Sequence, residues 1–118
     1  AASLSLTKRR TPMKYLLLIY TASEDIAHNT INAAPLPIRP SASQAGEVLS
    51  YVALLPTSAA STMRMQGGRA KISPGPAVNT LEQLCACYLI SCNDLDEAAE
   101  WASQVLEPHN IAEIRPVF

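Results

Sequence analysis

The order of apolar and polar residues predicts three well-marked strands. Lys14 to Tyr20 (KYLLLIY) has apolar side chains at consecutive positions, which is typical of a central strand covered on both faces. Leu84 to Cys92 is rich in β-forming and small apolar residues and predicts a second buried strand. Ile111 to Val117 alternates, so that Ile111, Glu113, Arg115 and Val117 share one side of a last strand while Ala112 and Ile114 share the other.

A helix is predicted between the last two strands. Asp94 is placed to cap it, and Glu97 follows three residues later to complete a capping box. Pro108 is expected to end it. The apolar positions that form one face of this helix are Leu95, Ala98, Ala99, Ala102, Val105 and Leu106. We expect that face to pack on a sheet, with Trp101 packing beside it.

The middle of the chain is predicted to form turns and short helical or extended segments. Three prolines between Thr21 and Gln44 exclude a long helix there, and a short helix over Ser41 to Leu49, capped by Ser41 or Ser43, is the nearest candidate. Tyr51 to Leu55 reads as a short extended segment. Ser61 to Met65 and Arg69 to Ser73, on either side of Gln66-Gly67-Gly68, predict a hairpin.

This element order predicts an α+β fold close to the ferredoxin-like split βαβ arrangement, with an antiparallel sheet that carries helices on one face. The other face then needs a cover. A second copy packed face to face would supply it, and the space between the two sheets would be a natural ligand cavity. We therefore expect a homodimer that forms an α+β barrel.

Length and charge narrow the class of protein. The chain has 118 residues, 48% of them hydrophobic, which suits one domain over residues 13–118, with residues 1–12 as an N-terminal extension. Its 9 basic and 10 acidic residues argue against nucleic acid as a partner. The longest apolar run is too short to cross a bilayer, so we expect no membrane association. Three cysteines fit reduced thiols and a cytoplasmic location.

Few residues are candidates for chemistry. His28 and His109 are the only side chains that titrate near neutral pH without help, so both are candidate catalytic residues; a structural histidine at a helix end and an exposed loop histidine are the alternatives. Cys85 and Cys87 are expected on one side of a strand and Cys92 on the other. Because no CxxC pair or nearby histidine accompanies them, core packing is favoured over a metal site, and no cofactor is expected.

Candidate ligand-binding residues lie on the strands and on one loop. Arg115 could anchor a carboxylate or phenolate in a closed cavity, or pair with an acidic group across a subunit interface, and the sequence leaves both readings open. Tyr20 and Arg64 are further candidates for lining such a cavity. Pro74, Gly75 and Pro76 form a rigid loop that presents its backbone in one shape.

Several blocks in order resemble the YCII-related family, in its DGPF-motif branch. The blocks are MKYLLLIY from Met13, EQL from Glu82, YLI from Tyr88, DLDEAAEWA from Asp94 and EIRPV from Glu113. The resemblance implies a dimeric α+β barrel of ferredoxin-like subunits. Some relatives are linked to dehydrochlorination of aromatic breakdown products, and others are encoded beside extracytoplasmic-function sigma factors. His109 matches a histidine often found before the last strand of the family.

The sequence departs from the family at the loop that names the branch. The motif falls on Pro74 to Ala77, where the aspartate and phenylalanine are absent, and Asn79 stands where the family has an acidic residue. Two functions are therefore expected. The first is binding of a small organic anion or aromatic metabolite between two sheets, with a lyase or isomerase step as a further expectation. The alternative is a non-catalytic regulatory or interaction protein associated with sigma-factor regulation, and the sequence leaves open whether the chain is an enzyme.

Overall fold

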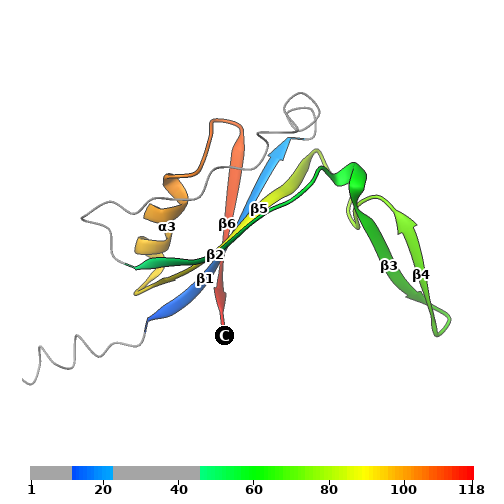
Figure 1. Ribbon diagram of the computed structural model, residues 1–118, viewed down its shortest axis with the longest axis horizontal. Coiled ribbons are helices and arrows are strands. Elements are labelled where there is room, and N and C mark those ends of the chain that lie inside the picture. The colour runs from blue at the N-terminus through cyan, green and yellow to red at the C-terminus, as the bar shows by residue number, and fades with distance from the viewer. Residues whose placement is uncertain (1–11, 23–45) are drawn as a thin grey trace, which may run out of the picture.

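Four antiparallel strands form the main sheet of the computed structural model, which describes residues 12–22 and 46–118 (Figure 1). The sheet order is β2-β5-β1-β6. The strands are β1 (Met13–Ala22), β2 (Glu47–Ala53), β5 (Glu82–Cys92) and β6 (Asn110–Val117). With helix α3 (Leu95–Ser103), this sheet gives a small α+β fold, as predicted.

Helix α3 covers one face of the sheet (Figure 1). Beneath it lie alternate side chains of β1, namely Tyr15, Leu17 and Ile19, because successive residues of a strand point to opposite faces. Trp101 of the helix is fully buried in the same core, which confirms its predicted packing role. The face of α3 that is buried is therefore rotated toward Trp101 relative to the predicted apolar face, since Leu95 of the predicted face remains 57% exposed.

The N-terminus of α3 is capped largely as predicted. The Glu97 backbone N–H donates to Asp94 Oδ1 at 3.0 Å, which satisfies one of the donors that a helix start leaves free. The Glu97 carboxylate accepts from the backbone N–H of Asn93, one residue earlier than in a standard capping box. The helix ends at Ser103, so the prediction that it runs to Pro108 was wrong.

The predicted hairpin is confirmed as β3 (Ser61–Gln66) and β4 (Arg69–Pro74). Gly67 and Gly68 both have positive φ, 58° and 79°, as a two-residue type I′ turn requires. This hairpin forms a separate two-stranded sheet, joined to β2 through the short 3₁₀ helix η1 (Thr57–Ala59).

The prediction of a short helix over Ser41 to Leu49 was wrong for its last three residues, because residues 47–49 belong to β2. Gly46 has φ +98°, and a Cβ there would lie 2.3 Å from the backbone oxygen of Ser91 on β5, so only glycine fits this approach. From there β2 pairs with β5 and turns Val48 and Tyr51 toward the core. Residues 41–45, and with them both predicted caps, lie outside the described residues, as do the proline-rich segment and residues 1–11 of the predicted extension.

A bulge in β5 changes the predicted sides of the cysteines. Ile19 pairs with Ala86 and Tyr20 with Leu84, so Cys85 is an extra residue between them. The bulge puts Cys85 in the core together with Cys92, and it leaves Cys87 half-buried on the opposite face beside Leu18. All three are free thiols.

Within residues 12–22 and 46–118, no helix has the length and apolar character needed to cross a bilayer.

Candidate functional site

The sheet face opposite α3, here called the open face, carries no helix from the described part of the chain (Figure 1). The strand pairing places Val52, Cys87, Leu18 and Glu113 side by side across it. Most of its residues are apolar and half-buried or exposed. The open face consists of Lys14, Leu16, Leu18, Tyr20, Glu47, Ser50, Val52, Leu84, Cys87, Leu89, Ser91, Ile111, Glu113, Arg115 and Val117.

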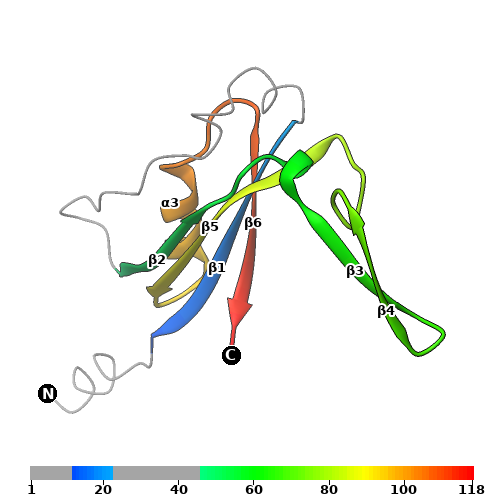
Figure 2. The same cartoon turned by 45° about the vertical axis from the view of Figure 1, so that its right-hand side comes forward.

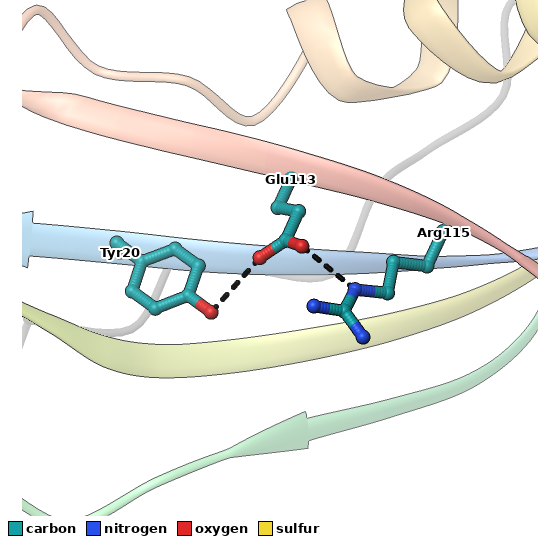
Figure 3. Close-up of polar contacts among 3 residues, drawn as sticks. All are labelled: Tyr20, Glu113 and Arg115. Carbon is teal, nitrogen blue, oxygen red and sulfur yellow. Dashed lines mark hydrogen bonds and ion pairs between the residues drawn. The ribbon is translucent and has the colours of Figure 1, made fainter. Parts of the chain in front are cut away.

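Three polar side chains form a hydrogen-bonded row along one edge of the open face (Figure 3). The Tyr20 hydroxyl donates to Glu113 Oε1 at 3.1 Å. The other carboxylate oxygen, Oε2, accepts from Arg115 Nε at 2.7 Å in an ion pair. Tyr20 comes from β1, and the other two residues alternate along β6, so the row needs the β1–β6 pairing.

This row has a definite protonation pattern. The hydrogen bond from Arg115, followed by the one from Tyr20, lowers the pKa of Glu113 below its ordinary 4.5. Burial, followed by the hydrogen bond to Glu113, raises the pKa of Tyr20 above 10.0. At neutral pH, Tyr20 is thus a neutral hydrogen-bond donor beside an ionised carboxylate. The Arg115 side chain is 67% exposed, which leaves its outer N–H groups open to an anionic group.

A hollow of about 390 Å³ adjoins the row. Tyr20, Ile111 and Glu113 line it from the sheet, and residues 80–82 line it from the approach to β5. Its size falls in the range of small-molecule sites, about 300–1,000 Å³. The hollow thus offers a tyrosine ring and an isoleucine side chain beside the carboxylates of Glu82 and Glu113, while the guanidinium group of Arg115 lies next to Glu113 and outside the lining.

Acid titration tests the Glu113 contacts. Because the pKa of Glu113 is lower in the folded chain than in the unfolded one, its stabilising contribution is complete above about pH 4.5 and is lost as the pH falls through the lowered value. We expect Glu113→Gln to flatten the fall in melting temperature below that pH. Glu107→Gln makes the same chemical change outside the row and is the matched control. Equal acid profiles for wild type and Glu113→Gln would contradict the expectation.

A second group of predicted site residues meets at the base of the hairpin. Arg64 Nη2 donates to the backbone oxygen of Ala77 at 2.8 Å, which ties the guanidinium to the loop after β4. The backbone oxygen of Gly75 accepts from Thr62 Oγ1 at 2.8 Å, and the Gly75 N–H donates to the backbone oxygen of Ala60. Arg64, Pro74, Gly75 and Pro76 therefore lie together, but in a different place from Tyr20 and Arg115.

An apolar hollow of about 440 Å³ lies beside this loop, with Pro76 in its wall. Gln83 is its one strongly buried polar wall residue, and its amide nitrogen donates to the backbone oxygen of Thr80. The remaining lining residues come from the end of β2, η1 and the start of β5: Ala53, Leu54, Leu55, Pro56, Thr57, Ala59, Ala60 and Leu84.

The two predicted catalytic histidines do not join either group. His109 is exposed in the turn before β6 and lines neither hollow. His28 lies outside the described residues. Across the described ranges, no cluster of three or more His, Cys, Asp or Glu side chains could hold a metal ion.

Some residues of the site could be predicted from the sequence, and others could not. Glu113 and Ile111 share their side of β6 with Arg115, so strand alternation was a usable signal for both. Thr80 and Leu81 lie before β5 in a stretch without periodicity. Only the folded chain brings them beside Tyr20.

Comparison with known proteins gives a match to part of the chain. No family model matches the chain. A stretch of 59 residues is 42% identical to "Uncharacterized protein R00369" of Rhizobium meliloti (strain 1021), and it covers 50% of this chain and 48% of that protein. The match thus spans about half the length of this relative.

Proposed function

We propose that this chain is a YCII-related protein that binds a small organic anion, such as an aromatic acid, between the sheets of a homodimer. Each subunit is ferredoxin-like, and the two sheets together form an α+β barrel. The all-antiparallel order β2-β5-β1-β6, with α3 on one face, supports this arrangement. A cytoplasmic location suits the three free thiols.

The apolar character of the open face supports a second copy as its cover. Leu16, Leu18 and Leu89 lie near its centre, where contact with another apolar surface would remove them from water. Four strands spaced about 4.8 Å apart and about eight residues long give a face of roughly 500 Å². Pairing through the β6 edge of the sheet is less favourable, because Pro116 on this strand cannot donate a ladder hydrogen bond.

One observation carries the ligand proposal: the Tyr20–Glu113–Arg115 row borders a hollow on this same face. A facing sheet would enclose the hollow and exclude water from it. Glu113 accepts only the Nε–H of Arg115, so the outer N–H groups of the guanidinium would donate to the carboxylate or phenolate of a ligand. The ring of Tyr20 would pack against its apolar part.

Binding is better supported than catalysis. A carboxylate whose pKa is lowered is a weak proton acceptor at neutral pH, so Glu113 is poorly suited to start a lyase or isomerase step. The second candidate function is a non-catalytic regulatory or interaction protein connected with sigma-factor regulation. The poor suitability of Glu113 as a base and the absence of the loop aspartate both support it. Recovery of a stoichiometric protein partner from native cells, together with no stabilising ligand, would favour that candidate.

A thermal-shift screen of aromatic and aliphatic carboxylic acids tests the proposal. A ligand present at about 100 times its dissociation constant stabilises the folded state by about 2.7 kcal/mol and raises the melting temperature by several degrees. We expect Arg115→Ala to abolish this rise. Arg69→Ala removes an arginine from the far end of the hairpin and should preserve it. A screen without any stabilising acid, or an equal rise in both variants, would reject the proposal.

A further inference from the structure

The β3–β4 hairpin, here called the arm (residues 61–74), extends away from the main sheet. Figures 1 and 2 agree that it projects on the side opposite α3, which is the side of the open face. Every residue of the arm except Thr62 is exposed. A lone two-stranded hairpin is only marginally stable in water, so an arm of this kind is expected to pack against something.

The two faces of the arm differ in character. Met63 pairs with Ile72, and Met65 pairs with Ala70, so these four side chains share one face. The three large ones are 64–70% exposed and are neighbours on that face, so they form a contiguous apolar patch. The opposite face carries Arg64, Gln66, Arg69 and Lys71. The arm is thus amphipathic, with a continuous apolar face that lacks a cover from the described residues.

Charge favours the approach of the arm to the body of a second copy. It contains three basic residues and no acidic one. The rest of the described chain has only two basic residues, Lys14 and Arg115, and eight acidic ones. Arm and body are therefore complementary in charge, and opposite charges on two copies favour their encounter.

The surface area that a stable dimer must bury also favours a contact between the arm and a second copy. Stable interfaces bury about 800 Å² on each partner, which exceeds the roughly 500 Å² of the open face. Two six-residue strands make an arm about 20 Å long and about 10 Å wide, adding roughly 200 Å². Sheet and arm together thus come close to what a stable dimer needs, whereas the sheet alone falls short.

We propose that the arm of each copy packs its apolar face, Met63, Met65 and Ile72, against the body of a second copy and so clasps the dimer. The second copy is the same one that covers the open face, so the inference rests on the proposed homodimer. The clasp is reciprocal, because a two-fold dimer gives each subunit both an arm and a surface that receives one.

Matched charge substitutions on neighbouring residues test the clasp. Ile72→Asp places a carboxylate on the apolar face of the arm, and Ser73→Asp places the same charge one residue later on the other face. By sedimentation, we expect Ile72→Asp to raise the dimer dissociation constant at least about 10- to 100-fold, since in each of the two arms it removes a buried isoleucine and places a charge in the contact. Ser73→Asp should change it less than about threefold, within the range of ordinary surface substitutions.

Hydrogen exchange on the wild-type chain provides a second measurement that needs no substitution. Amides of the arm should be protected at concentrations where the dimer forms and should lose protection on dilution, before the amides of β1 and β5 do. Equal dissociation constants for both variants, or arm amides that exchange freely within the dimer, would overturn the clasp while leaving the sheet-to-sheet dimer standing. A monomeric wild type would overturn both, and arm protection that appears only with added duplex DNA would assign the arm to nucleic acid instead.

Discussion

Replacing Trp101 with alanine is expected to lower the free energy of unfolding by about 3–5 kcal/mol. Trp101 is fully buried and belongs to the core between α3 and the sheet, with Leu17, Tyr88 and Ile90. Removing the indole leaves a cavity that the small neighbours Ala98 and Ala102 cannot fill. For a domain whose total stability is about 5–15 kcal/mol, this is a large share. Urea unfolding followed by far-ultraviolet circular dichroism would measure the loss.

Leu95→Ala on the same helix is the control for this experiment. Leu95 belongs to the apolar stripe predicted from helical periodicity, yet it is 57% exposed in the structure. We expect its replacement to cost less than about 1 kcal/mol. Comparable losses for Leu95→Ala and Trp101→Ala would mean that the helix faces the sheet as the periodicity predicted, and that the orientation described here is wrong.

The second large effect is expected for Leu18→Asp. Leu18 lies near the centre of the open face, and in the proposed homodimer an aspartate there would be buried against apolar side chains without a partner. We expect the dimer dissociation constant to rise more than about 100-fold, because an unpaired charge in an interface costs several kcal/mol. The monomer should keep its fold, since Leu18 is only half-buried within one chain. Sedimentation and circular dichroism on the same sample would separate the two effects.

Leu17→Asp gives the matched comparison, because the same change one residue earlier falls on the opposite face. Leu17 is fully buried under α3, so this variant is expected to unfold rather than dissociate. A Leu18→Asp protein that stays dimeric would rule out pairing through the open face. One that unfolds as Leu17→Asp does would show that Leu18 belongs to the interior of a single chain.

Elements whose signals are local could be predicted from the residues alone. Strands β1, β5 and β6 follow from apolar runs and alternation, the hairpin turn from Gly67-Gly68, and the start of α3 from Asp94. In each case the residues that set the conformation lie within a few positions of the element they specify. Hydrogen bonding, capping and positive φ at a turn are short-range effects, so a pattern in the sequence is enough to predict them.

Other features depend on contacts between residues that are far apart in the chain, and the folded structure was needed to find them. Position 46, just before β2, requires glycine because the backbone oxygen of Ser91 lies against it, and the bulge at Cys85 directs that thiol to the core. The Tyr20–Glu113 hydrogen bond joins residues 93 positions apart. The rotation of α3 toward Trp101 likewise depends on packing against the sheet. Strand register, bulges and the facing side of a helix are set by packing over the whole domain, which no local pattern records.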